Sequence, residues 1–371
     1  MSAGSPSRSP PLARRTLVSP RAPLSYCQIT LLPYLPPEMP SGPASALAFA
    51  LFLFLALVKG TSPMRNLISL ADLTPAELDH LVRRAVSFGR DGIVPKPLAG
   101  RQIGLYFRKS STRTRTSFWS GATRLGADVI TFGPNELQLT TGETVEDTAR
   151  VLGQYLDALV VRTNGDVEEI RRLGSSEDLA VVNALSLDEH PTQAIADLAT
   201  LTEQFGSLDG LHLLAVGEGN SSGAALALAA ALTPGLRLTL LCPQGYEVPK
   251  DTLDLAAELS DGKALVTQIV TPGEVEGPVD AVYTSRWQTM GVTKENPDWL
   301  SDFDGFQINR GFLERFGGPQ TVFLHDLPAV RGEEVTDEVL DGPASLAWRQ
   351  AHHKMTAAAA VLEWCVAGAQ D

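Results

Sequence analysis

Cysteine is scarce in this sequence. Its 371 residues include three cysteines, Cys27, Cys242 and Cys365, which lie far apart and have no C-x-x-C spacing. The odd number and the wide separation indicate neither a disulfide framework nor a zinc site. We therefore expect a cytoplasmic protein from a reducing compartment, with no bound metal ion.

Positive charge is also in short supply. The sequence has 30 lysines and arginines against 43 aspartates and glutamates, a formal net charge of -13. Nucleic acids and anionic membranes attract proteins that present a basic face, so neither is an expected partner. A chain of this length with 44% hydrophobic residues exceeds one ordinary core and fits two α/β lobes. The expected partner is a small molecule.

Acidic residues are nearly missing from the first 63 residues. Residues 1–43 are rich in proline, serine and arginine, and the apolar run "ASALAFALFLFLALV" follows from Ala44 to Val58. The run is shorter than the roughly 20 residues that span a membrane, although the core of a signal peptide can be this short. The leader 1–63 is therefore interpreted as a disordered segment, a secretory signal or an organellar transit peptide, unless translation begins at Met64.

From Met64 onward, helical patterns alternate with short apolar runs. Thr74, Pro75 and Glu77 form an N-cap, a first-turn proline and a capping-box acid, which predict the start of a helix. The apolar runs are typical of strands covered on both faces, and strand–helix–strand repetition implies parallel sheets. We predict an α/β fold with two doubly wound parallel-sheet lobes, one before about Gly206 and one after it. The predicted strands are 102–107, 128–132, 158–162, 180–184, 212–217, 237–242, 264–270, 281–284 and 321–325.

A basic, hydroxyl-rich stretch, "FRKSSTRTRTSF", runs from Phe107 to Phe118. It follows the predicted strand 102–107 and leads into a helical pattern, so it lies at the carboxyl end of a parallel strand, where such sheets bind ligands. A helix N-terminus favours an anion by roughly 0.3–1 kcal/mol, and arginine can hold two phosphate oxygens at once. The stretch predicts a phosphate cradle, although a capped helix with solvated arginines would show the same pattern.

Three stretches together resemble one known family. "SSTRTRTSF" resembles the carbamoyl-phosphate loop of the transcarbamylases, and "HPTQAIADLAT" (His190 to Thr200) resembles their second signature. "HDLPAVRGEEVTDEVLDGPAS" (His325 to Ser345) resembles a segment of the ornithine carbamoyltransferases. The similarity extends from about Met64 to Gly368. It implies a carbamoyl-phosphate-binding domain over 64–205, an amino-acid-binding domain over 206–343, and a C-terminal helix over 344–371 that returns to the first domain.

The resemblance also implies roles for individual residues on the phosphate side. Arg162 would bridge phosphate and carbonyl oxygen, His190 would polarise the carbonyl, and Gln193 would hold the carbamoyl NH2. Lys354 stands at a position where the family has an arginine. A lysine ammonium lacks the planar guanidinium that can hold two oxygens at once. Gln138 lies in a loop, 133–144, that reaches into a neighbouring subunit in the family, which implies a homotrimer with shared active sites. The expected phosphate ligands are Ser111, Thr112, Arg113 and Thr114, with Arg113, Arg162, His190 and Gln193 as the catalytic residues.

The amino-acid side departs from the ornithine enzymes. Ser221 replaces a second asparagine, Ser285 replaces an amine-contacting aspartate, and Asp326 replaces a cysteine. "SRWQ" also resembles the T-R-x-Q of aspartate carbamoyltransferases, so Arg286 could face a carboxylate. We expect L-ornithine as the acceptor and no cofactor; the open alternatives are acetylornithine, putrescine, lysine, an aspartate-like or secondary-metabolite amine, or a non-catalytic carbamoyl-phosphate-binding protein. The expected amino-acid ligands are Asn220, Ser221, Ser285, Arg286, Gln288, Thr289, Met290, Asp326 and Leu327.

Two further patterns suggest other chemistry and are disfavoured. "AVGEGNSSG" follows a predicted strand, but the dinucleotide pattern G-x-G-x-x-G would require glycine at Ser222, and the next strand ends without a ribose-binding acid. His352 and His353 are neighbours that point about 100° apart on a helix, which argues against a shared metal ion. We expect both histidines to lie on the surface.

Overall fold

The computed structural model describes residues 64–368, with the exception of 164, 264 and 289–293. The predicted leader lies outside the described residues. The first long helix, α2 (Pro75–Asp91), begins as predicted: Thr74 accepts a hydrogen bond from the Glu77 N–H, and the Glu77 carboxylate accepts one from the Thr74 N–H. This capping box satisfies N–H groups that the first turn of a helix leaves unpaired. None of the helices in the described part of the chain is long and apolar enough to cross a membrane.

A four-stranded parallel sheet forms the first lobe, in the order β2-β1-β3-β4. β3 is buried along its whole length, which explains why its sequence is apolar at consecutive positions and does not alternate. Helices α3 (Arg113–Leu125), α4 (Val145–Leu152) and α5 (Val167–Leu173) connect the strands. The strands are β1 (Gln102–Phe107), β2 (Asp128–Phe132), β3 (Ala158–Arg162) and β4 (Ala180–Leu185).

The second lobe holds a five-stranded parallel sheet in the order β7-β6-β5-β8-β9. Its helices include α7 (Ser221–Ala231), α8 (Lys250–Leu259), α9 (Arg310–Phe316) and α10 (Asp337–Leu340). Its strands are β5 (His212–Val216), β6 (Arg237–Leu241), β7 (Leu265–Ile269), β8 (Val279–Thr284) and β9 (Gly317–His325).

All nine predicted strands are present, and the predicted two-sheet α/β fold is confirmed. The largest difference is at β9, which begins four residues before the predicted Thr321. Glycine and proline are rare in strands, so the "GGPQ" start was not recognisable, yet Gly317 pairs with Val279 across an irregular register.

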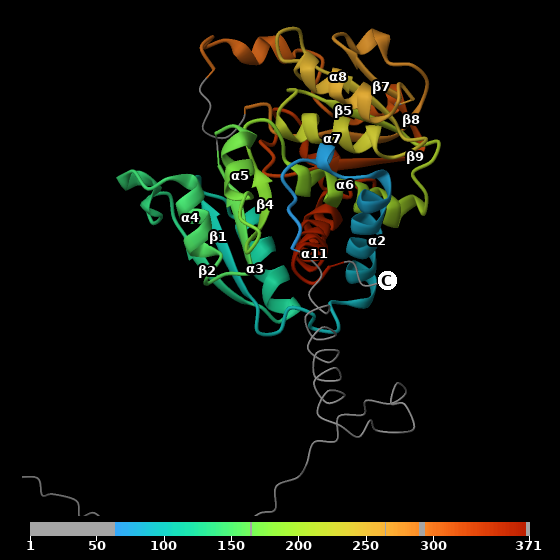
Figure 1. The fold of residues 1–371 in the computed structure, drawn as a ribbon. Coiled ribbons are helices and arrows are strands. Elements are labelled where there is room, and N and C mark those ends of the chain that lie inside the picture. The colour runs from blue at the N-terminus through green and yellow to red at the C-terminus, as the bar shows by residue number, and fades with distance from the viewer. Residues whose placement is uncertain (1–63, 164, 264, 289–293, 369–371) are drawn as a thin grey trace, which may run out of the picture. The chain divides into compact units, whose positions relative to one another are not determined.

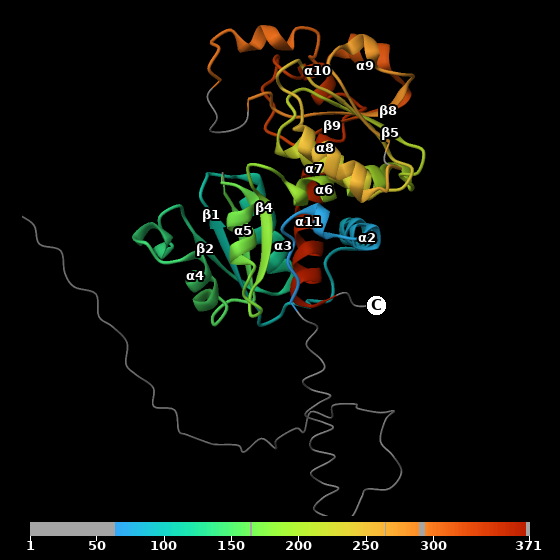
Figure 2. The same ribbon diagram turned by 45° about the horizontal axis from the view of Figure 1, so that its top comes forward.

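Long helices join the two sheets. α6 (Pro191–Phe205) follows β4, and α11 (Ala347–Val366) returns from the second lobe to pack against α2, α3 and α6. Figures 1 and 2 both show α11 beside α2 and next to the first sheet. A Cβ atom at Gly121 of α3 would lie 3.2 Å from the Met355 carbonyl oxygen, so this glycine permits the close approach of α3 and α11.

The two sheets each have one point where the strand order reverses. In the first sheet this point lies between β1 and β3, and in the second between β5 and β8. Ligands of open parallel sheets bind beside the carboxyl ends of strands at such reversals. The loops after these four strands are therefore the parts of the fold best placed to form a site.

Candidate active site

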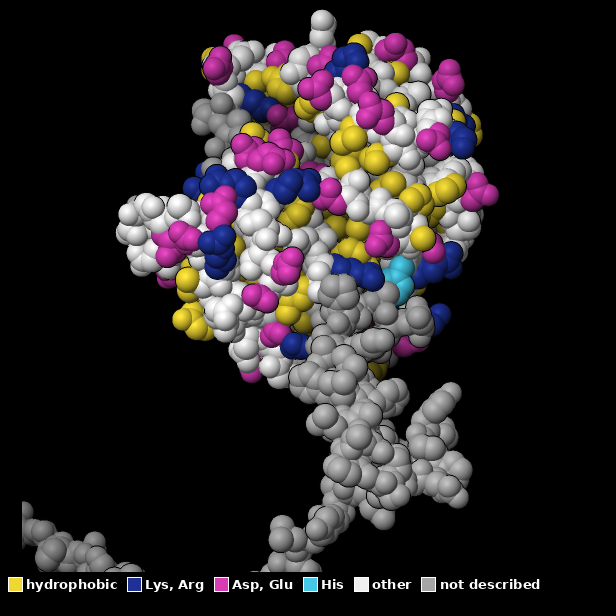
Figure 3. Space-filling model, viewed as in Figure 1, with side chains coloured by type: hydrophobic (Ala, Val, Ile, Leu, Met, Phe, Trp, Pro, Cys, Tyr) yellow, Lys and Arg dark blue, Asp and Glu magenta, His cyan; other side chains and the backbone are white. Residues whose placement is uncertain are grey.

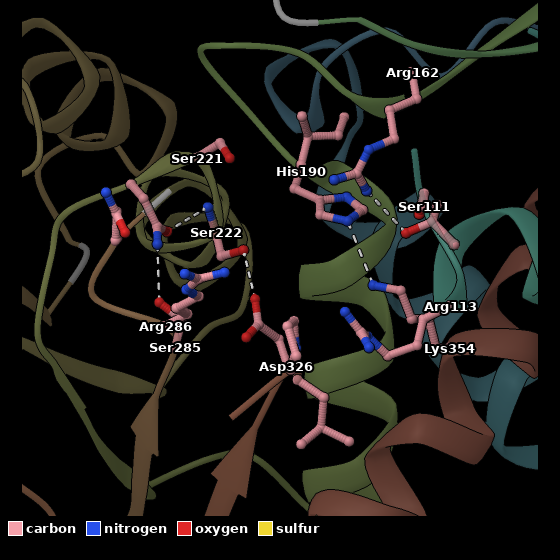
Figure 4. A pocket seen from close by; sticks show the side chains of 16 residues that line it. Ser111, Arg113, Arg162, His190, Ser221, Ser222, Ser285, Arg286, Asp326 and Lys354 are labelled. Atoms are coloured by element: carbon pink, nitrogen blue, oxygen red, sulfur yellow. Dashed lines mark hydrogen bonds between the residues drawn. The ribbon is translucent and has the colours of Figure 1, made fainter. Parts of the chain in front are cut away.

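One pocket collects residues from the carboxyl ends of strands in both sheets (Figure 4). It has a volume of about 100 Å³. The first lobe contributes the loop after β1, the last residue of β3 and the start of α6, and the second contributes the loops after β5, β8 and β9. The lining residues are Ser111, Arg113, Thr114, Arg162, Leu185, His190, Asn220, Ser221, Ser222, Ser285, Arg286, Gln288, Asp326, Leu327, Pro328 and Lys354.

Three of the residues that the sequence predicts as a phosphate cradle, Ser111, Arg113 and Thr114, line one side of this pocket. Arg113 is the first residue of α3 and Thr114 the second, so both lie at a helix N-terminus. Arg162 is the last residue of β3, is buried, and donates from Nη1 to the Thr114 hydroxyl at 3.1 Å. Its Nε is buried and has no hydrogen-bond partner among the described residues. The Arg162 guanidinium therefore retains a donor for a ligand.

Three cations converge on this side. Burial, together with repulsion by Arg113, lowers the pKa of Arg162 to about 10. Burial also lowers the pKa values of Arg113 and Lys354, while attraction to the Asp326 carboxylate opposes both shifts. Asp326 is the one acidic residue among the described residues that line the pocket. A bound anion would relieve the repulsion between these cations, so the electrostatics favour an anionic ligand.

These cations lie within a strongly acidic chain. On the face seen in Figure 3, acidic and basic side chains are interspersed. The positive charge needed for an anion is thus concentrated at one internal site and does not come from the net charge of the molecule, which is -13.

His190 lines the pocket as a neutral imidazole. Burial and the neighbouring Lys354 and Arg162 hold its pKa well below the usual value for histidine. The Lys354 ammonium lies 3.4 Å from Nε2 and can only donate, so Nε2 accepts and the proton resides on Nδ1. Nδ1 is buried and unpaired in the described part of the chain. This N–H is available to a ligand oxygen.

Gln193 lies directly behind the pocket wall and not on it. Its Oε1 accepts a hydrogen bond from the Lys354 ammonium, and its Nε2 donates to the Asp197 carboxylate at 2.7 Å. The predicted contact of Gln193 with the carbamoyl NH2 stays a prediction. In the structure the amide oxygen faces Lys354, because α11 brings the ammonium against α6.

The other side of the pocket comes from the second lobe. Asn220 caps α7 by accepting from the Ser222 N–H at 2.9 Å, and its Nδ2 donates to the Ser285 hydroxyl at 2.9 Å. The Ser222 hydroxyl donates to Asp326 at 3.1 Å. The His190 N–H donates to the Ser221 carbonyl at 3.1 Å, which ties the two sides together.

This second side offers charges of both signs. Arg286 lines the pocket, and its buried Nε has no hydrogen-bond partner among the residues that the structure describes. The Asp326 carboxylate supplies the opposite charge. Figure 4 shows Asp326 between the group around Arg286 and the group around His190. A ligand that carries both a carboxylate and an amine matches this arrangement.

Most of the predicted site residues meet in this pocket, and the exceptions have structural reasons. Thr112 is the N-cap residue of α3, and its exposed side chain makes no cap hydrogen bond. Gln138 lies in an exposed 3-10 helix, η2 (Gln138–Thr141), where its Oε1 accepts from the Thr141 hydroxyl. Thr289 and Met290 lie outside the described residues.

Sequence reasoning missed three lining residues, Leu185, Ser222 and Pro328. Each directly neighbours a predicted strand end or a recognised motif. Including every residue of the loops that follow the predicted strands would have found all three. Leu327 was recognised, but its φ of +55 was not. This conformation is rare for a residue with a bulky side chain, and it turns the chain at the edge of the pocket.

The expectation that both histidines of the C-terminal helix lie on the surface is wrong for His353. Its side chain is fully buried; Nε2 pairs with Glu203 at 3.1 Å and Nδ1 with the Thr356 hydroxyl at 3.0 Å. The error arose because α11 is covered by other helices along most of its length. Among the described residues there is no cluster of three or more side chains suited to a metal ion.

The fold and the site together define a two-lobed α/β protein whose pocket suits an anion on one side and a molecule with an amine on the other. Residues 65–203 match the family model described as "Aspartate/ornithine carbamoyltransferase, carbamoyl-P binding domain". Residues 209–365 match the model described as "Aspartate/ornithine carbamoyltransferase, Asp/Orn binding domain". The chain belongs to the aspartate/ornithine carbamoyltransferase family.

Several similar proteins of known name are ornithine carbamoyltransferases. The chain is 37% identical over 292 residues to the ornithine carbamoyltransferase of Haloquadratum walsbyi, covering 79% of this chain and 94% of that protein. It is 38% identical over 313 residues to that of Caldicellulosiruptor saccharolyticus, covering 82% and 99%. The solved structure of the Pyrococcus furiosus ornithine carbamoyltransferase aligns with a TM-score of 0.77 at 32% identity and covers 84% of this chain and 99% of its own.

Proposed function

We propose that this protein is an ornithine carbamoyltransferase, which transfers the carbamoyl group of carbamoyl phosphate to L-ornithine and releases L-citrulline and phosphate. One observation carries the proposal. Arg113, Arg162, Lys354 and a neutral His190 surround one side of the same pocket whose other side presents Asp326 and Arg286. The relatives named ornithine carbamoyltransferase support the same activity.

The phosphate group would bind at the N-terminus of α3. Arg113 and the hydroxyls of Ser111 and Thr114 would hold its oxygens, and Thr112 would contribute its backbone N–H. Arg162 is already fixed by Thr114, so little side-chain freedom is lost when it takes up the ligand. The helix dipole and the two guanidinium groups would stabilise the charge that builds on the departing phosphate.

The carbonyl oxygen of the carbamoyl group would face the His190 Nδ1–H and the Arg162 Nε–H, which have no partner among the described residues. Attack by the amine turns this oxygen into an oxyanion, and donors that wait in a buried site stabilise it. The loss of one such donor typically lowers kcat about 100- to 1000-fold. Keeping His190 neutral serves this role, because Nδ1–H then donates a hydrogen bond without adding a further charge to the cation cluster.

The acceptor would bind between the second lobe and the carbonyl carbon. A new C–N bond forms, the C–O bond to phosphate breaks, and the nitrogen loses a proton to the departing phosphate or to solvent. Asp326 would pair with an ammonium group of the acceptor, since buried cations need a counter-charge. Arg286 would pair with a carboxylate, with Asn220, Ser221, Ser285, Gln288, Leu327, Thr289 and Met290 as the remaining acceptor ligands.

The acceptor is tested by product analysis with carbamoyl phosphate and a panel of amines. Ornithine, acetylornithine, putrescine, lysine and aspartate would each be assayed for the ureido product and for phosphate. We expect citrulline from ornithine at the highest kcat/KM. A higher kcat/KM for another amine would change the acceptor and leave the carbamoyl transfer in place.

Arg286 favours one alternative acceptor class. The Arg286 guanidinium, whose Nε has no partner among the described residues, suits an amino acid with a second carboxylate, as in the aspartate branch of the family. Putrescine has no carboxylate, so a preference for putrescine would contradict a role for Arg286 in recognition. Carbamoyl-phosphate binding with no product from any amine would instead indicate a non-catalytic binding protein.

The assembly, the compartment and the pathway are part of the same proposal. We infer a homotrimer in which Gln138 of one subunit completes the phosphate site of the next, supported by its exposed position on η2. Sedimentation equilibrium should give the mass of three chains. A cytoplasmic location is supported by Cys242 and Cys365, which are buried and form no disulfide within the described residues. A role in arginine biosynthesis is supported by the relatives named ornithine carbamoyltransferase. Cell fractionation tests the location, and an arginine-dependence test of a deletion strain tests the role.

A further inference from the structure

Gln193 has a fixed amide orientation because it lies between two groups of opposite hydrogen-bonding character. The Lys354 ammonium can only donate, so it faces Oε1. The Asp197 carboxylate oxygen Oδ1 accepts from Nε2 at 2.7 Å. A flipped amide would place NH2 against an ammonium, so one orientation is strongly favoured.

The amide of Gln350, on α11, is also held at both its oxygen and its nitrogen, and its NH2 donates to the same Asp197 oxygen as Gln193. Its Nε2 donates to Asp197 Oδ1 at 2.7 Å, and its Oε1 accepts from the backbone N–H of His325 at 2.8 Å. His325 Nδ1 in turn accepts from the N–H of Leu327 at 2.8 Å. This branch therefore reaches the loop that carries Asp326 and Leu327, on the acceptor side of the pocket.

Asp197 is the meeting point of both branches. It is almost fully buried, as are Gln193, Gln350 and His325, which come from α6, α11 and β9. Buried polar groups that share hydrogen bonds stabilise one arrangement strongly, because each lost bond leaves an unpaired donor in an apolar interior. The second carboxylate oxygen, Oδ2, has no partner among the described residues.

We propose that Asp197 is a positioning residue that orients two amides, Gln193 beside the carbamoyl-phosphate side and Gln350 beside the acceptor side. Asp197 does not line the pocket and would touch neither substrate. It acts by accepting from both amides at Oδ1, which aims Gln193 at Lys354 and holds the His325–Leu327 turn. The proposal rests on the proposed function, since it assigns the two branches to the two substrates.

Three variants and one control separate orientation from charge and from simple destabilisation. Asp197→Asn keeps an oxygen for both amides but removes a charge that raises the pKa of Lys354. It is therefore measured near pH 6.5, where Lys354 stays protonated, and we expect kcat and both KM values within about threefold of the parent. Asp197→Leu removes the acceptor, and we expect kcat to fall about tenfold or more and the Kd for carbamoyl phosphate, measured by calorimetry, to rise about tenfold. Thr200→Val removes a buried hydroxyl that bonds within its own helix, and it should leave these constants unchanged.

Gln350→Leu tests the acceptor branch by itself. It breaks the link to His325 but leaves Gln193 bound to Asp197, so the KM for ornithine should rise about tenfold while the Kd for carbamoyl phosphate stays within about twofold. This variant and Asp197→Asn decide the question even if Asp197→Leu does not fold.

Specific outcomes would overturn the proposal. It fails if Asp197→Asn is as impaired as Asp197→Leu is predicted to be, because charge and not orientation would then matter. It fails equally if Asp197→Leu behaves like Thr200→Val, or if Gln350→Leu weakens both substrates alike. Absence of carbamoyl transfer by the unmodified protein would instead reject the proposed function, and the calorimetric comparison with carbamoyl phosphate would still measure the Gln193 branch.

Discussion

The buried carboxyl of Glu189 offers a quantitative test of how the site is held in place. Glu189 immediately precedes His190 and is 4% exposed. Its Oε2 accepts from the Ser69 hydroxyl at 2.5 Å and its Oε1 from the Leu70 N–H at 2.8 Å. These bonds attach the backbone before His190 to the segment that precedes α2. Burial nevertheless dominates and raises the pKa of Glu189 to about 7.

The sign and size of the effect on stability follow from this shift. In the unfolded chain the carboxyl titrates near 4.5, so between pH 4.5 and 7 the folded state binds more protons than the unfolded state. The contribution of Glu189 is full below pH 4.5 and is lost as pH rises through 7. One pKa unit corresponds to about 1.4 kcal/mol, which gives a loss of about 2.5 kcal/mol between pH 5 and pH 8.

Glu189→Gln isolates this term, because glutamine keeps the shape and can accept from Leu70 but does not titrate. The free energy of unfolding in urea would be measured for parent and variant at pH 5 and pH 8. We expect the variant to gain about 2.5 kcal/mol relative to the parent over this interval. Glu77→Gln is the matched control: the pKa of Glu77 is lowered by its hydrogen bonds to Thr74, so its contribution should be constant over the same range. A parent–variant difference for Glu189 that is independent of pH would refute the reasoning.

Three further predictions address the pocket itself. Arg113→Ala should lower kcat/KM about 100-fold or more while the circular dichroism spectrum stays unchanged, because Arg113 is half-buried and lines the phosphate side; retained turnover would contradict its role. Burial lowers the pKa of Lys354, so carbamoyl-phosphate affinity should fall as pH rises from 7.5 to 9. Lys354→Arg should flatten that decline in calorimetry, and an identical decline would show that another group titrates. Mixed oligomers reassembled from Gln138→Ala subunits and Arg113→Ala subunits should regain activity that neither variant has alone. The absence of recovery would argue against a site shared between subunits.

Much of the fold was accessible from local sequence patterns. Runs of consecutive apolar residues identified central strands such as β3 and β5 because these are buried along their whole length, and the capping residues Thr74 and Glu77 identified the start of α2. Of the pocket, the strand-end pattern predicted the basic loop with Arg113. The resemblance to the transcarbamylases supplied Arg162, Asn220, Ser285 and Asp326, and the structure places all five at or just after the carboxyl ends of strands.

The parts that were missed depend on contacts between distant segments. Lys354 reaches Gln193 across 161 positions of the sequence, and Gln350 reaches Asp197 across 153. No local pattern encodes which face of α11 meets α6, so the orientation of Gln193 and the network around Asp197 could not be anticipated. The burial of His353 has the same origin, because an alanine-rich helix can be covered on several sides.

Transfer of a labelled carbamoyl carbon tests the central claim most directly. Carbamoyl phosphate labelled with ¹³C at its carbonyl would be incubated with the protein and ornithine and followed by NMR together with the released phosphate. The account predicts that the label appears in the ureido carbon of citrulline, with one phosphate released for each citrulline formed. Phosphate release without label in any amine of the panel, or no consumption of carbamoyl phosphate by folded protein, would contradict it.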